Sequence, residues 1–364
     1  MRFIATTGTT IARLACHSCG YAGAIRATLG VRGDGEESCA IARESLERAS
    51  VRILARRYGK GKNTVMRIIH RVAASLPSSA DVAARFRPRW SGILVFDGKV
   101  ARVYDALAAK LDQSRFSDDE IRWLHKMRWL CGVDHGTGDL PHYDLAEAES
   151  RIDLVMYFET LKTLGYPLKA VVCDGNPEIP RAARFVFGQG LVIQRCVRHF
   201  LEDLRRLLPP RDDPERPELE RLVESIRTVI MAPSIEASAE RLDAVRRAAR
   251  RSRQPVAHQM LALLEGCKEE LCAYLIHPRL RLPRTSNDAE SLFKQLNLRL
   301  RSLGRFFRQR YARDYLNAWA LLRRFTPFTD CRGGRRARNG KAPLALAGAE
   351  IKNIDPLTLR KQQP

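Results

Sequence analysis

Two aspartates of the chain directly follow short apolar runs, and each is followed by glycine. Asp97 ends the run Ile-Leu-Val-Phe, and Asp174 ends the run Ala-Val-Val-Cys. A carboxylate at the end of a buried strand lies at the edge of a sheet, where α/β proteins commonly bind ligands. Each aspartate also has a purely structural interpretation. Asp97 with Gly98 fits a hairpin turn, and Asp174 fits the cap of a helix that starts near Pro177.

A third acid, Glu290, lies in the first turn of a helix that is predicted to begin near Asn287. A carboxylate at this position favours the positive end of the helix dipole. Thr285 with Asp288, or Asn287 with Glu290, also fits a capping box. Taken singly, each of the three acids therefore has an ordinary structural role open to it.

Considered together, the three acids indicate metal-dependent chemistry. Converging carboxylates repel each other, and hard divalent cations with oxygen ligands remove that repulsion. Two such cations, about 3.5 to 4 Å apart, can promote an in-line phosphoryl displacement. We expect Mg²⁺, or alternatively Mn²⁺, as the cofactor. The expected catalytic residues and metal ligands are Asp97, Asp174 and Glu290.

The charge of the chain indicates a polyanionic partner. Lys and Arg number 63 against 41 Asp and Glu in 364 residues, which gives a net charge of +22. Such an excess favours nucleic acid, and we expect double-stranded DNA. No apolar run is long enough to span a bilayer, and the N-terminus does not resemble a signal peptide. The nine cysteines are scattered, as in reduced intracellular proteins, so the expected location is the cytoplasm, at the nucleoid.

A helix-turn-helix is predicted between Glu44 and Leu76. Helical periodicity over 45–58 and 64–76 surrounds a turn at 59–63, and Val65, Ile68, Ile69 and Val72 would form the buried stripe of the second helix. An ordinary helical hairpin with a solvated basic face is the alternative. The residues expected to contact DNA phosphates are Arg52, Arg56, Arg57, Lys60, Lys62 and Arg67.

The elements that would position the acids form a mixed α/β sheet. Strands are predicted over 91–96, 99–104, 129–135 and 140–148, with period-two alternation and turn residues between them. Helix 152–164, strand 168–173, helix 182–187 and strand 191–196 follow. Three amphipathic helices, at 218–231, 235–251 and 256–276, then predict an all-helical insertion. The predicted organisation is a segment 1–40, a helix-turn-helix 41–88, the first part of the catalytic domain 89–205, the insertion 206–283, the last helices 284–326 and a disordered basic tail 327–364.

The segment from Lys294 to Lys341 is basic and contains interleaved aromatic residues. It holds fourteen Lys or Arg against two Asp. We assign Arg299, Arg301 and Arg305 to phosphate contacts. The aromatic residues fit either stacking on an exposed base or a place in the core, and both interpretations stay open. These residues are Phe306, Phe307, Tyr311, Tyr315 and Trp319.

Two pairs of residues have the spacing of metal ligands. Cys16 and Cys19 form the first half of a zinc ribbon, but a second pair is missing, so a degenerate ribbon is favoured over a Zn²⁺ site. Cys196 and His199 lie three residues apart and fit either a metal site or a hydrogen-bonded thiol and imidazole. We favour the hydrogen-bonded pair, because two ligands do not make a structural zinc site.

Four segments of the chain resemble bacterial transposases of the Mutator-like group. They are ILVFDGK, AVVCDGNPEIPRAARFVF, IQRCVRHF and RTSNDAESLFKQLNLRLRSLGRF, within about residues 90–325. The resemblance implies an RNase H-like domain whose acidic triad lies on the first strand, the fourth strand and a helix after a helical insertion. Those positions are Asp97, Asp174 and Glu290. The family's Cys-x-x-His motif matches Cys196 and His199, and Asn287 also fits the family pattern.

The function that this resemblance implies is DNA transposition. The protein would hydrolyse one strand at the end of a mobile element and join the 3′-hydroxyl to target DNA, acting as a homo-oligomer on DNA. One alternative is a DNA-binding regulator, or an inactive domesticated transposase, that acts through the helix-turn-helix. A metal-dependent nuclease without strand transfer is a third interpretation.

Overall fold

A computed structural model of the chain describes residues 11–15, 22–26, 34–103, 126–303, 306 and 308–361. Cys16, Cys19, Arg305 and Phe307 lie outside the described residues. The half ribbon at the two cysteines is therefore not described. Near it, β1 (Ile11–Ala15) and β2 (Ala22–Arg26) pair as an antiparallel hairpin.

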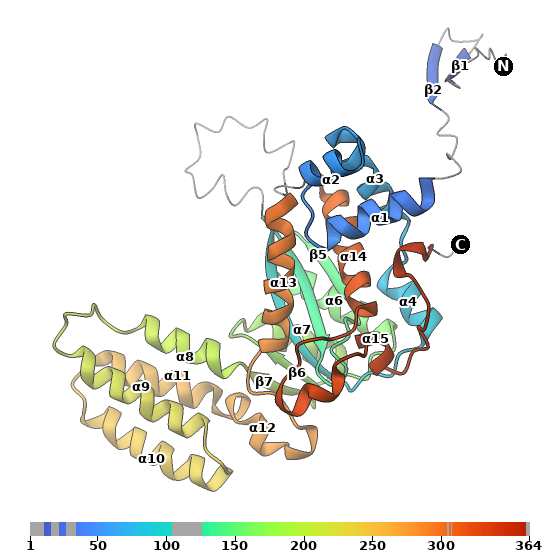
Figure 1. Cartoon of the computed structure of the whole chain (residues 1–364). Coiled ribbons are helices and arrows are strands. Elements are labelled where there is room, and N and C mark those ends of the chain that lie inside the picture. The colour runs from blue at the N-terminus through green and yellow to red at the C-terminus, as the bar shows by residue number, and fades with distance from the viewer. Residues whose placement is uncertain are drawn as a thin grey trace.

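The described part of the chain is a mixed α/β structure around a five-stranded sheet (Figure 1). Its strands lie in the order β5-β4-β3-β6-β7. β3, β4 and β5 pair in antiparallel fashion, whereas β6 runs parallel to β3 and β7 runs parallel to β6. The predicted mixed α/β sheet is confirmed. The strands are β3 (Ile93–Arg102), β4 (Lys126–Asp134), β5 (Tyr143–Ala146), β6 (Ala170–Cys173) and β7 (Val192–Arg195).

The hairpin turn at Asp97 and Gly98 was a wrong alternative. β3 passes through both residues without a turn, and they pair with Cys131 and Leu130 of β4. The strands predicted at 91–96 and 99–104 are thus one strand. A long antiparallel partner stabilises the extended backbone here and outweighs the turn preference of an Asp-Gly pair.

Helices cover both faces of the sheet, as the alternation of side chains along β3 requires. Leu94 and Phe96 pack on one face with α6 (Arg151–Thr163) and α7 (Glu178–Phe187). Ile93 and Val95 point to the other face. That face shares a core with α13 (Asn287–Leu303) and α14 (Gln309–Phe325).

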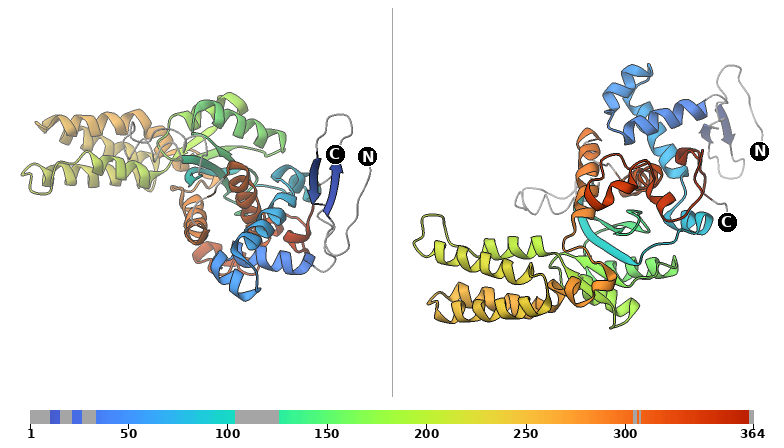
Figure 2. Two further views of the ribbon diagram at one scale, coloured as in Figure 1. Left: turned by 90° about the horizontal axis from the view of Figure 1, so that it is seen from above. Right: turned by 60° about the horizontal axis from the view of Figure 1, so that its bottom comes forward.

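The insertion is a separate helical unit that projects from the edge of the sheet (Figures 1 and 2). Its own apolar core includes Leu204, Ile226, Val245 and Leu264. The three amphipathic helices predicted there are present, and a further helix leads into them. The helices are α8 (Val197–Arg206), α9 (Arg216–Ile230), α10 (Ile235–Arg251), α11 (Pro255–Leu271) and the short α12 (Ala273–Ile276), followed by the 3₁₀ turn Pro278–Leu280.

The N-terminal helices pack against α14, and their core is continuous with that of the sheet. They are α1 (Asp34–Leu46), α2 (Val51–Arg57), α3 (Lys62–Ser75) and α4 (Ser79–Phe86). The predicted stripe Val65, Ile68, Ile69 and Val72 is buried in α3.

The single helix predicted over 45–58 is wrong. The chain breaks between α1 and α2, where Arg48 has a φ of 122°. Ser50 then caps α2 by accepting a hydrogen bond from the Ile53 amide at 3.4 Å. A serine that caps a helix favours a new start over continuation of the old helix.

The C-terminal segment is not disordered, contrary to the sequence-based prediction. Residues 327–361 wrap around the domain through the 3₁₀ helix η4 (Gly333–Arg338), the short helix α15 (Pro343–Leu346) and the 3₁₀ helix η5 (Pro356–Thr358). Leu344 and Leu357 are fully buried in the main core. Two widely spaced leucines produce no periodic pattern in a basic, Gly-rich segment. Their burial in the core could therefore not be predicted from the sequence.

The aromatic residues left undecided are largely in the core. Phe306, Tyr315 and Trp319 are buried. Tyr311 is half-buried and stacks on His70, with ring centroids 4.0 Å apart. Across the described residues, no helix is long and apolar enough to cross a membrane.

Candidate active site

The pairing of the two central parallel strands brings Asp97 and Asp174 together. Leu94 pairs with Val171 and Val95 with Val172, so the same register puts Asp97 beside Asp174. Asp97 is the fifth residue of β3, and Asp174 directly follows β6. Residues at the same register position of neighbouring strands point to the same face of the sheet. The two carboxylates therefore lie on the same face of the sheet, where β6 ends.

Asp174 is not a helix cap, although the sequence allowed that interpretation. Its Oδ1 accepts a hydrogen bond from the Asn176 amide at 3.0 Å, and Asn176 in turn accepts one from the Glu178 amide. α7 begins at Glu178, and its N-cap residue, Pro177, forms no capping hydrogen bond through its side chain. The aspartate thus shapes the turn after β6, and within the described part of the chain its second oxygen accepts no hydrogen bond.

Glu290 reaches the same site from the first turn of α13. Its side chain is 13% exposed and forms ion pairs with Arg198 and with His199, the latter at 3.9 Å. Ser286 Oγ donates a hydrogen bond to Glu290 Oε1 at 3.1 Å. The capping-box interpretations fit less well, because Asp288 pairs instead with His135 and Arg335. Asn287 is the first residue of the helix.

The electrostatics of Asp97 reflect the convergence of the three acids. Burial, the negative charge of Asp174 and a smaller contribution from Glu290 raise the pKa of Asp97 to about 6. A hydrogen bond from the Gly98 amide, 2.8 Å long, acts in the opposite direction. A buried carboxylate whose pKa is raised by neighbouring negative charges is stabilised by a divalent cation.

A fourth acid of this cluster, Glu149, was missed in the sequence. It lies between β5 and α6, and its carboxyl group contacts the Cα side of Gly98: a Cβ built on that glycine would lie 2.8 Å from Glu149 Oε1. Burial and the charge of Asp174 raise the pKa of Glu149 to about 7. Its sequence context, a loop before the capping serine of α6, gives no signal beyond the presence of the acid itself.

Cys196 and His199 lie beside Glu290, at the start of α8. The Ser286 amide and hydroxyl both donate to the buried Cys196 sulfur at 3.4 Å. Burial raises the pKa of the Cys196 thiol, but hydrogen bonds from His199 and Ser286 outweigh it, so that this pKa lies below its ordinary value. The bond to Cys196, together with the charges of Asp97 and Glu290, raises the pKa of His199 to about 9.

This geometry fits the hydrogen-bonded thiol and imidazole that the sequence favoured. Among the described residues, ligand atoms of Cys196, His199 and Glu290 also lie within 4.8 Å of one another. Such proximity is compatible with a metal ion, but the hydrogen bonds already satisfy the thiol and the imidazole. The cluster connects the end of β7 to the first turn of α13.

The residues predicted to contact DNA lie apart from the acids, on the N-terminal helices and the far end of α13. Arg52, Arg56, Lys62 and Arg67 are exposed, as is Arg301. Among the other described members, Arg57 pairs with Glu44, Lys60 pairs with Glu37, and Arg299 donates to the Leu46 carbonyl.

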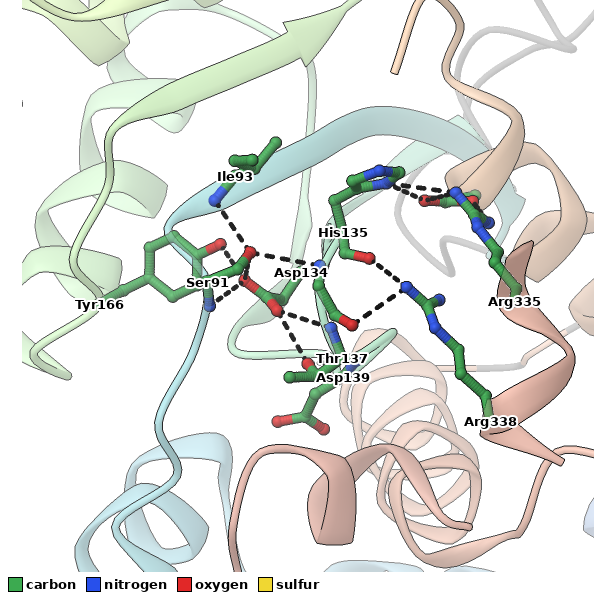
Figure 3. A network of polar contacts seen from close by, with 11 residues as sticks. Ser91, Ile93, Asp134, His135, Thr137, Asp139, Tyr166, Arg335 and Arg338 are labelled. Carbon is green, nitrogen blue, oxygen red and sulfur yellow. Dashed lines mark hydrogen bonds and ion pairs between the residues drawn. The ribbon is translucent and has the colours of Figure 1, made fainter. Parts of the chain in front are cut away.

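A second polar network fixes the opposite end of β3 and β4 (Figure 3). The buried Asp134 accepts hydrogen bonds from Ser91, Thr137 and Tyr166. Asp288 is held by His135 and by Arg335 of the C-terminal segment. Arg338 donates to the carbonyls of His135 and Gly136, at 2.6 and 3.0 Å. Since every acid here already has several donors, we interpret this network as structural.

Comparison with known proteins does not identify the chain. No family model matches the sequence, and no curated protein was found to match it.

Proposed function

We propose that the protein is a DNA transposase of the type that uses three acidic residues. It would hydrolyse a phosphodiester bond at the end of a mobile element and then join the freed 3′-hydroxyl to target DNA. The observation that carries the proposal is the convergence of Asp97, Asp174 and Glu290 on one face of the central sheet, beside the end of β6. The chain would act on double-stranded DNA as a homo-oligomer.

The order of elements supports an RNase H-like catalytic domain. The first acid lies on the first strand of the main sheet, and the second follows its fourth strand. The third is in the first turn of the helix after a helical insertion. Three antiparallel strands, with two parallel strands added beside β3, also agree with the fold that the resemblance implies.

The donor set fits Mg²⁺. The converging ligands are carboxylate oxygens, which hard divalent cations prefer. When bound, the cations would supply activation of the attacking oxygen and stabilisation of the departing one. Asp97, Asp174 and Glu290 would hold them, and Glu149 lies near enough to Asp97 and Asp174 to orient a ligand or water.

The N-terminal helices support DNA recognition. α2 and α3 are joined by a short turn at residues 58–61, and their exposed side carries Arg52, Arg56, Lys62 and Arg67. We propose that α3 serves as the second helix of a helix-turn-helix and that these cations contact phosphates.

The test uses the full chain and a labelled duplex that carries the DNA flanking its gene. We expect nicked and joined products in Mg²⁺ and none when EDTA removes the metal. Asp97→Asn and Glu290→Gln should abolish both products without abolishing binding. Binding without cleavage, in Mg²⁺ and in Mn²⁺, would contradict the proposal.

One observation favours the alternative of a DNA-binding regulator or an inactive transposase. Glu290 forms an ion pair with Arg198, so the Arg198 guanidinium neutralises one of the carboxylates that would hold a metal. Arg198→Ala distinguishes the two functions. If the protein is an active transposase and Arg198 only neutralises Glu290 in the absence of metal, the substitution should increase metal affinity. If the protein is a regulator or an inactive transposase, the variant should still not cleave DNA.

A further inference from the structure

An arginine-lined groove crosses the molecule on the side of α13 that faces away from Glu290. It has a volume of about 680 Å³ and is bordered by the end of α1, by α13 and α14, and by the C-terminal segment. Along α13 it extends from Asp288 to Arg299. Eleven residues of helix correspond to about 16 Å, roughly the axial length of five base pairs. The groove is therefore too long for a single small anion.

Cations dominate the wall of this groove. Among the lining residues that the structure describes, three are acidic, and one of these, Asp288, is already paired with His135 and Arg335. Arg48, Arg323 and Arg332 form no ion pair with a carboxylate within the described chain. The arginines of the wall are Arg48, Arg299, Arg323, Arg332, Arg335 and Arg338.

The arginines also crowd one another. Burial lowers the pKa of Arg299, and the positive charge of Arg48 lowers it further. Burial likewise lowers the pKa of Arg323, with a contribution from Arg299. Guanidinium groups held together in this way favour an anion between them.

Arg48 is held in the groove by a strained backbone. Its φ of 122° lies outside the left-handed region that non-glycine residues tolerate. Such strain costs about 1 to 3 kcal/mol and tends to persist where it serves a function. Glycine would suit this backbone better than arginine. An arginine at this position therefore indicates that its exposed side chain has a function.

We propose that this groove binds one phosphodiester strand of duplex DNA, separately from the acidic site and from the exposed face of α2 and α3. The inference rests on the proposed function, because it assumes that DNA is the substrate. It names a second DNA contact, made jointly by the turn after α1, α13, α14 and the C-terminal segment. The C-terminal segment thereby becomes part of the DNA-binding surface.

The groove predicts opposite effects of one substitution on stability and on binding. Arg48→Gly removes a cation and relieves the strained backbone, so the free energy of unfolding should rise while DNA affinity falls. A purely structural role of Arg48 would not produce this combination. Equal or tighter DNA binding by Arg48→Gly would overturn the proposal.

The second test removes three cations and measures the salt dependence of binding without metal. Arg48→Gly, Arg323→Gln and Arg332→Gln are combined, and affinity for a labelled DNA duplex is measured by fluorescence anisotropy over a series of salt concentrations. The slope of log affinity against log salt should fall in magnitude by about 2 to 3, since each phosphate contact contributes about 0.9. The matched control removes three exposed cations on α6 and α7, namely Arg151, Lys162 and Arg181, and should leave the slope unchanged.

The outcomes separate the groove from the proposed function. If the unmodified protein binds no DNA, the proposed function fails. If it binds DNA and the groove variant keeps the full slope, the function stands and the groove proposal is overturned. The proposal would also be overturned if the groove variant showed a smaller slope of log affinity against log salt for duplex RNA but an unchanged slope for duplex DNA.

Discussion

The buried ion pair between Asp139 and Arg324 joins α14 to the turn after β4, and it can be broken from either side. Both side chains are fully buried. Arg324 Nε and Nη2 donate to the two carboxylate oxygens of Asp139 at 2.8 Å each, and Trp90 Nε1 donates to one of them at 2.9 Å. Asp139→Asn leaves the guanidinium without its counter-charge in the core. The free energy of unfolding should fall by about 3 to 5 kcal/mol.

The double variant Asp139→Asn with Arg324→Met tests whether the loss of stability comes from the lost ion pair or from the unpaired Arg324 charge left in the core. Among the described residues, Arg324 Nη1 is buried without a hydrogen bond, so the guanidinium is incompletely satisfied even in the native protein. Arg324→Met removes that group. Asp139→Asn with Arg324→Met should therefore be less destabilised than the sum of the single variants, by about 0.5 to 3 kcal/mol.

Urea denaturation followed by circular dichroism measures these free energies. The double variant should unfold at a higher urea concentration than Asp139→Asn alone. Strictly additive single and double effects would refute the reasoning, since they would mean that the two charges do not interact in the folded protein.

Three further predictions test the core, the acidic site and the C-terminal segment. Burial lowers the pKa of His142 to about 4, whereas its value in the unfolded chain is about 6.5, so the unfolded chain binds a proton at higher pH than the folded protein. The free energy of unfolding should therefore fall by up to about 3 kcal/mol as the pH drops from 6.5 to 4. Urea titrations that show no dependence of this free energy on pH would contradict the prediction. Gly98→Ala should displace the Glu149 carboxyl group and reduce DNA cleavage with little change in stability, whereas Gly190→Ala, which has open space around it, should change neither. Leu357→Ala should lower the unfolding free energy by about 2 to 5 kcal/mol because Leu357 is fully buried, whereas a change below about 1 kcal/mol would indicate a loose C-terminal segment.

Much of the central sheet could be predicted because its strands are short, apolar and well separated. The runs that end at Asp97 and Asp174 are buried central strands, and their parallel pairing explains why acids far apart in sequence become neighbours. The position of Glu290 followed from the helical pattern after the insertion. Each of these sequence signals is local, and the fold of the sheet brings the three acids together.

The features that escaped prediction depend on tertiary contacts. Glu149 joins the acids because it contacts Gly98, and nothing in its own segment indicates that contact. The Asp97-Gly98 pair carries a turn signal, but pairing with β4 keeps it extended. The C-terminal segment is basic and aperiodic, yet Leu344 and Leu357 fix it in the core.

The most direct test of the central claim measures DNA binding and DNA cleavage side by side for Asp174→Asn. This substitution keeps the size of the side chain but removes a negative charge and an oxygen ligand, which should weaken metal binding and leave the developing charge poorly stabilised. Asp212→Asn, in an exposed loop of the insertion, is the matched control. On one labelled duplex in Mg²⁺, we predict that Asp174→Asn binds as well as the unmodified protein but neither nicks nor joins DNA, while Asp212→Asn does all three. Cleavage by Asp174→Asn at the unmodified rate would contradict the assignment of the active site.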